Sequence, residues 1–295
     1  ARACGTNAGA IGAAALANGP DSLAIGVNAT ANQTSSLAVG TNANASGVNA
    51  TAVASDAIAS GTNALAMGKA AIASGTNATA IAVAASANGV DSVALGVRAS
   101  ASGNQSMALG TNTLASGTNA TAIASNATAQ GANAVALGVF ANASALSALA
   151  FGTNALANGI NATAIASNAT ATGNNSIAIG VFASAQQANA QAFGVNASAN
   201  GINAVAIAAN AFANGVNSMA IGVDADATQN NSVAVGTLAQ ATGVGALAFG
   251  ANAAATAVDT MAFGVNSSAT AANATAIGRN ALASSTNAIA LGLFS

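Results

Sequence analysis

The sequence predicts an all-β fold, a parallel β-roll solenoid in which one coil corresponds to one row of a regular repeat. The chain divides into rows of 14 from Ala8 onwards without an insertion or deletion, giving 20 complete rows and a partial row from Ala288. Large apolar residues within a row lie two apart, which is the period of a strand. Gly-x-Asn recurs at the row boundary, where both residues favour tight turns. Together these observations predict one coil per row.

The consensus row is Ser/Ala-φ-Ala-φ-Gly-x-Asn-Ala-x-Ala-x-Gly-x-Asn, where φ is large and apolar, and we number its positions 1 to 14. Position 3 is Ala in all 21 rows, position 10 is Ala in every row that reaches it, and position 8 is almost always Ala. Position 4 is always large and apolar. Position 5 is Gly, or Ala in five rows: Ala54, Ala82, Ala124, Ala166 and Ala208.

Each row therefore predicts two short strands and two tight turns. Ala is a strong helix former, so a helix is the competing interpretation, but Gly and Asn recur in every row and interrupt helices. Such rows stack as the coils of a solenoid. We expect residues 1–295 to form a single continuous roll of about 21 coils.

The two sides of the first strand predict how the coils pack. Positions 1 and 3 face one way and positions 2 and 4 the other, because side chains alternate along a strand. Columns made only of Ala fit inside a very thin roll, so the large residues point outwards. Burying each large side chain contributes about 1.5–3 kcal/mol, and a monomer would expose more apolar surface than soluble monomers usually do. The sequence therefore predicts association.

The candidate interface residues all occupy position 4. They are Ile25, Leu95, Leu109, Ile123, Leu137, Phe151, Ile165, Ile179, Phe193, Ile207, Ile221, Phe249 and Phe263.

Two further features follow the repeat. The Asn columns predict ladders of side-chain hydrogen bonds from coil to coil. A longer period of three rows separates four of the rows with Ala at position 5, and it also separates Arg98, Phe140, Phe182 and Asp224. This period indicates that a unit of three rows was duplicated after the single row.

The recurring Asn/Asp-Ser-φ-Ala-φ-Gly segments resemble a known family. They include Asp21–Gly26, Asp91–Gly96, Asn175–Gly180, Asn217–Gly222 and Asn231–Gly236. Over essentially the whole chain, the pattern resembles the head domains of YadA-like trimeric autotransporter adhesins of Gram-negative bacteria. The resemblance implies a left-handed roll, a homotrimer, and attachment to host surfaces, matrix proteins or other cells.

The resemblance also implies a location at the bacterial cell surface, held by an outer-membrane anchor outside these residues. The basic neck, the heptad stalk and the anchor strands of the family have no counterpart within residues 1–295. The chain is therefore expected to be either an excised head or a protein that is a head-like rod throughout.

Composition argues against several other functions. The chain has no His and no Glu, charged residues are 3%, and the net charge is −2. These numbers leave no catalytic triad, acid–base pair or zinc site, so we expect no enzyme, cofactor or metal. Asp224 and Asp226 are the one pair conceivable for calcium, but the Gly-rich repeat of calcium-binding rolls is absent. Neither a nucleic-acid partner nor a membrane-spanning segment is indicated.

A few side chains depart from the repeat and are candidate contacts. Phe140, Phe182 and Phe294 replace the usual Asn at position 7, and Phe212 stands at position 9. If exposed, they would contact a partner; if the trimer contact extends around the turn, they would only pack within it. Arg98 and the three other basic residues are expected to be solubilising surface charges.

Asn-x-Ser/Thr triplets occur 16 times, and a repeat rich in these residues produces them automatically. In five rows, however, Thr replaces the large apolar residue at position 2 after Asn-Ala. These rows lose an apolar side chain and gain an N-glycosylation sequon. The candidate glycosylation sites in these rows are Asn49, Asn77, Asn119, Asn161 and Asn273.

The sequence is compatible with three functions. The first is a non-enzymatic adhesin head that binds host matrix or cell-surface molecules through a repetitive outer face. The second is a structural subunit of an extracellular fibre, in which rolls associate end to end. The third is an ice-binding roll, which mixed residues at positions 9 and 11 disfavour. The lone Cys4 is either a small buried residue or a cross-link between identical chains.

Overall fold

The computed structural model describes residues 1–295, and it contains strands and turns but no helix. The 42 strands form coils of two strands each. The chain divides into two compact units, which we name the N-terminal unit (Ala1–Ser147) and the C-terminal unit (Ala148–Ser295). The predicted all-β solenoid, with one coil for each row of the repeat, is confirmed.

Each coil has a long strand of three residues at positions 2–4 and a short strand of two residues at positions 9–10. In the N-terminal unit, the long strands recur once per row from β2 (Gly9–Ile11) to β20 (Val135–Leu137), and the short strands from β1 (Arg2–Ala3) to β21 (Asn142–Ala143). In the C-terminal unit, the long strands recur from β22 (Leu149–Phe151) to β42 (Ile289–Leu291), and the short strands from β23 (Leu156–Ala157) to β41 (Leu282–Ala283).

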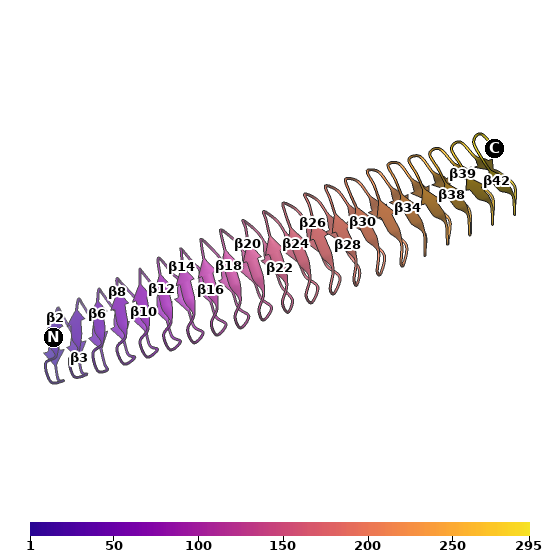
Figure 1. Cartoon of the computed structure of the whole chain (residues 1–295). Helices are drawn as coiled ribbons and strands as arrows, with labels where there is room; N and C mark the ends of the chain where they lie inside the picture. The colour runs from indigo at the N-terminus through magenta and orange to yellow at the C-terminus, as the bar shows by residue number, and fades with distance from the viewer. The chain divides into compact units, whose positions relative to one another are not determined.

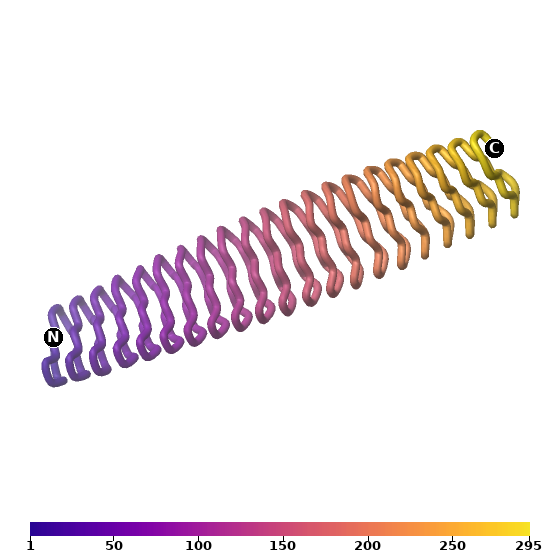
Figure 2. Tube along the Cα trace, in the orientation of Figure 1, coloured from indigo at the N-terminus to yellow at the C-terminus, as the bar shows by residue number.

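Within each unit, like strands of successive coils pair in parallel and in register. In the N-terminal unit, Leu65 of β10 (Leu65–Met67) stands beside Thr79 of β12 (Thr79–Ile81), one row further on. The pairing leaves the long strands on one side of each coil and the short strands on the other, with turns between them (Figures 1 and 2). Residues at the same position of successive rows therefore form a column along the unit.

The core of each unit is a set of Ala columns. Ala178 at position 3 and Ala185 at position 10 are both 0% exposed, and the same holds for nearly every Ala at these positions. The neighbours Ile177 and Ile179 are only half-buried, because they point out of the roll. The predicted assignment, with Ala inside and large residues outside, is confirmed.

The turns depend on residues that tolerate a positive φ. Asn at positions 7 and 14 adopts the left-handed region, as in Asn28 and Asn63 with φ of 57° and 58°. Gly180 at position 5 has φ of 135°, a conformation in which a Cβ is strained. Where Ala replaces Gly, as at Ala166, φ falls to 101° and remains in this unfavourable range. Asn and Gly therefore recur because the tight turns require them.

Candidate interaction surfaces

We name the outward side of positions 2 and 4 the long-strand face. All thirteen candidate interface residues lie on it, and none of them is buried within the chain. Phe151 is 49% exposed and Ile207 is 38% exposed, while most others are half-buried by their neighbours in the column. In the C-terminal unit, Phe249 and Phe263 stack with ring centroids 5.0 Å apart. Position 4 thus forms a continuous apolar stripe along this face in each unit.

Ser at position 1 braces the turn that precedes the long strand. The buried hydroxyl of Ser176 donates a hydrogen bond of 2.6 Å to the carbonyl oxygen of Gly173, and Ser218 does the same to Gly215 at 2.7 Å. Ser92 occupies the same place with a buried hydroxyl that has no partner. The Ser is therefore a local brace in four of the five recurring segments, which the sequence did not indicate.

Asn side chains at position 14 form the predicted ladders. In the C-terminal unit, six Asn from Asn161 to Asn231 are joined by consecutive amide-to-carbonyl hydrogen bonds of 2.9–3.5 Å. In each of these bonds, the side-chain amide N–H of one Asn donates to the side-chain oxygen of the Asn one coil later. The ladder therefore has a direction along the chain.

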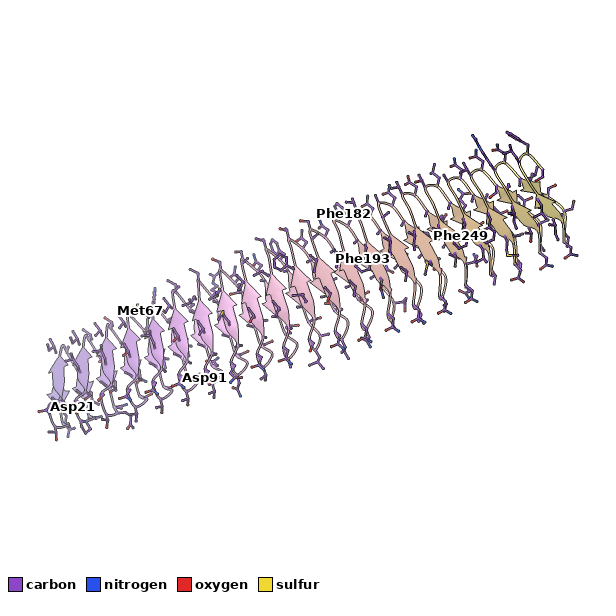
Figure 3. The ribbon with its side chains drawn as sticks, viewed as in Figure 1. Asp21, Met67, Asp91, Phe182, Phe193 and Phe249 are labelled. Carbon is purple, nitrogen blue, oxygen red and sulfur yellow. The ribbon has the colours of Figure 1, made fainter.

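Asp ends ladders of this kind in the N-terminal unit, at position 14 for Asp21 and Asp91 and at position 7 for Asp56. Asp21, Asp56 and Asp91 each accept a hydrogen bond of 2.8–3.1 Å from the Asn of the preceding coil. A carboxylate cannot donate onwards, and the residues that follow in the same columns are Ser35, Ala70 and Gln105. Figure 3 shows Asp21 and Asp91 along one turn edge of this unit. Asp replaces Asn where a run of Asn stops.

The five candidate glycosylation sites all lie in these position-14 turns. Each of the Asn residues is exposed. Four of them use the side-chain amide nitrogen to donate to the next coil; for Asn161 the bond to Asn175 is 3.1 Å. The Thr of each sequon is half-buried on the long-strand face. Glycosylation at these sites stays a prediction.

We name the outward side of positions 9 and 11 the short-strand face, and its composition is mixed. Phe212, Asp226 and Gln240 follow one another on paired strands β31 (Phe212–Ala213), β33 (Asp226–Ala227) and β35 (Gln240–Ala241). One carboxylate oxygen of Asp226 is buried without a partner, and burial raises the pKa of this carboxyl above its usual value. Asn44 and Asn142 also keep a buried oxygen without a partner at position 9.

The structure separates the candidate Phe contacts. Phe140 and Phe182 are each 57% exposed, whereas Phe212 is half-buried. Figure 3 shows Phe182 at the tip of a turn. Arg98, expected only to aid solubility, shares position 7 with them and is also exposed. The spacing of three rows was the signal in the sequence that linked these residues.

Neither unit contains a pocket, and no three metal-binding side chains lie together. No segment of the structure is a helix of the length and apolarity needed to span a bilayer. Cys4 is exposed and unpaired. The surfaces available for binding are therefore flat, repetitive faces and turn edges. A fold of stacked identical coils with such surfaces defines a repetitive β-solenoid of the kind that binds through extended faces.

Comparison with protein families is consistent with this class. The family described as YadA head domain repeat (2 copies) matches residues 5–29, 17–43, 31–53, 59–81, 87–113, 115–141, 143–165, 157–183, 171–190, 185–207, 213–239, 241–267, 255–281 and 269–295. The chain belongs to the YadA head domain family. This is a non-enzymatic family of head domains from trimeric autotransporter adhesins, and it is extracellular. No curated protein matched the chain.

Proposed function

We propose that residues 1–295 are a single, non-enzymatic adhesin head that works as a homotrimer of left-handed rolls. In this proposal, three chains associate through their long-strand faces. The outer faces attach to host matrix or cell-surface molecules, and the rest of the protein holds the head at the bacterial outer membrane. Family membership supports the class of protein, and the exposed apolar stripe supports the association.

The exposure of apolar side chains on the long-strand face is the main observation that supports the proposal. Met67 is 43% exposed and Phe151 is 49% exposed, although position 4 is apolar in every coil. An apolar column that recurs in every coil without a partner inside the chain favours burial between chains. A trimer places the same stripe of each chain against its neighbours around one axis.

Light scattering of the purified chain tests the association. We expect three times the chain mass of 27.1 kDa at micromolar concentration. A stable monomer under these conditions would contradict both the interface and the adhesin proposal. Electron microscopy of the same sample separates discrete trimers from continuous filaments, which would favour a fibre subunit.

Deletion of whole coils tests how the head attaches. Removing residues 22–63 takes out three complete rows, and thus three coils, and keeps the register of the remainder. Binding to immobilised matrix proteins and to glycans should fall in graded steps as such blocks are removed, because weak repeated sites act through effective concentration. Loss of all binding with one particular block would show a discrete epitope instead.

A further inference from the structure

Position 7 contains a conflict between local conformation and residue type at Arg98, Phe140 and Phe182. This position requires the left-handed region, which Asn tolerates well and large side chains do not. Arg98 and Phe140 in the N-terminal unit have φ of 56° and 59°, and Phe182 and Asp224 in the C-terminal unit have φ of 59° and 56°. All four side chains are exposed.

Stability of the chain does not explain the two Phe residues. Phe140 and Phe182 remain 57% exposed, so they gain little from burial. They also remove a rung from the Asn column, where Asn196 donates to Asn210 at 3.3 Å. Strained residues that bring no local gain are concentrated at functional sites. A partner that binds this turn edge would supply the gain that the single chain lacks.

On the position-7 edge of both units, a charged residue and a Phe are separated by the same distance, but they follow each other in opposite order along the chain. Three coils, or about 14 Å, separate the charge from the Phe in each unit, because parallel coils lie ~4.8 Å apart. Two Asn stand between them. Along the chain, the N-terminal unit presents Arg98, Asn112, Asn126 and Phe140, and the C-terminal unit presents Phe182, Asn196, Asn210 and Asp224.

We propose that the position-7 edge of the N-terminal unit docks, antiparallel, on the position-7 edge of the C-terminal unit of a second copy. Phe140 then stacks on Phe182, and Arg98 lies opposite Asp224. Matching either unit with its own counterpart at the same register would place Arg98 against Arg98 or Asp224 against Asp224. The antiparallel pairing of the two units is the one that matches aromatic with aromatic and opposite charges with each other.

Residues beside the edge fit the same pairing. At position 6, Val139 and Val181 are 39% and 38% exposed, and they stand next to the two Phe residues. Val97 and Val223, which are 40% and 42% exposed, would meet beside the charged pair. These exposed valines extend the contact with apolar area on both sides.

Beyond the charges, the column continues with apolar residues. Ala84 precedes Arg98 by one coil, and Leu238, with φ of 59° and 47% exposed, follows Asp224 by one coil. The antiparallel pairing brings these two together. The edge is narrow, so a single contact is weak, and the trimer of the proposed function would multiply it. The pairing itself does not depend on the trimer.

Charge exchange on the full chain tests the proposal. Sedimentation velocity over a concentration series should show association of the wild-type base oligomer into larger species. Arg98→Asp and Asp224→Arg should each weaken this association at least about tenfold, since like charges then face each other. An equimolar mixture of the two variants should associate again, and so should the doubly exchanged chain. High salt should weaken association of the wild type.

Phe140→Asn and Phe182→Asn test the aromatic contact. Asn is the usual residue at this position, so the temperature of thermal unfolding should be unchanged or slightly higher, while self-association weakens. Asp56→Arg reverses a charge at position 7 three coils before Arg98, beyond the segment from Arg98 to Phe140, and should have no effect on association. The proposal is wrong if wild type does not associate beyond the base oligomer, if single charge reversals associate normally, or if the mixture stays apart. The mass of the base oligomer reports separately on the trimer.

Discussion

The long-strand face and the short-strand face of one coil share a core but have different outward residues. Ala178 and Ala185 line the interior from the two strands and are equally buried. Outside, position 4 is large and apolar in every coil, whereas position 9 includes Ser184, Phe212 and Asp226. A face that is apolar in every coil can bind the same kind of surface along its whole length, such as the matching face of another copy. A face that varies suits contacts that differ from coil to coil.

The largest effect is expected from a charge on the long-strand face. Ile179→Asp places three carboxylates near the proposed axis without compensation, which should cost about 3–5 kcal/mol of association free energy. Analytical ultracentrifugation should show monomers that remain folded. Ser184→Asp puts the same charge on the short-strand face of the same coil, where Asp226 already provides a precedent. If Ile179→Asp stays trimeric and Ser184→Asp dissociates, the faces are assigned the wrong way round; if both stay trimeric, neither face forms the interface.

Overpacking the shared core should affect both strands alike. Ala178→Leu and Ala185→Leu each insert a large side chain at a position that is 0% exposed. We expect each to lower the free energy of unfolding by roughly 2–3 kcal/mol or to disrupt the local coils. Chemical denaturation monitored by circular dichroism measures this. A loss confined to one of the two variants would show that the strands do not share one core.

The Ser brace belongs to the long strand, and two Ser residues provide an internal control. Ser176→Ala removes a buried hydrogen bond of 2.6 Å and should cost about 1 kcal/mol. Ser92→Ala removes a buried hydroxyl without a partner and should be neutral or stabilising. Equal losses in the two variants, measured by urea denaturation, would contradict the role of the hydroxyl as a brace.

The smallest effect concerns Asp226 on the short-strand face. Burial raises the folded-state pKa of this carboxyl above the unfolded value. The unfolded chain therefore loses its proton first as pH rises, and stability falls between the two pKa values. Because this carboxyl is partly exposed and screened by solvent, Asp226→Asn should stabilise the chain at pH 7 by no more than about 0.5 kcal/mol. The gain should vanish below the unfolded pKa, and a gain that persists in acid would have another cause. Thermal unfolding at several pH values checks this.

Much of the fold could be predicted because its causes are local and repeated. A two-residue alternation sets the strands, all-Ala columns set the thickness of the roll, and Gly and Asn at fixed places set the turns. Each of these signals occurs some twenty times, so an error in one row does not change the prediction. The ladders along position 14 follow from the same register.

The surface was harder to predict, as the Phe residues show. Phe140, Phe182 and Phe212 all break the repeat, but exposure depends on the direction of the side chain at its own position. At the turn tip, Phe182 has few neighbours; on the short strand, Phe212 lies between the residues of adjacent coils. The strain at position 7 became visible only with the backbone angles.

By itself, the sequence determined the coil length, the parallel register, the buried Ala columns and the apolar stripe on one side, because periodic residue types dictate each of them. Only the tertiary structure decided which hydroxyl finds a partner, as Ser176 does and Ser92 does not. It also decided in which direction the Asn ladders run and which Phe residues are exposed. These properties depend on side-chain geometry across neighbouring coils, where shifts of a few tenths of an ångström decide whether a hydrogen bond forms.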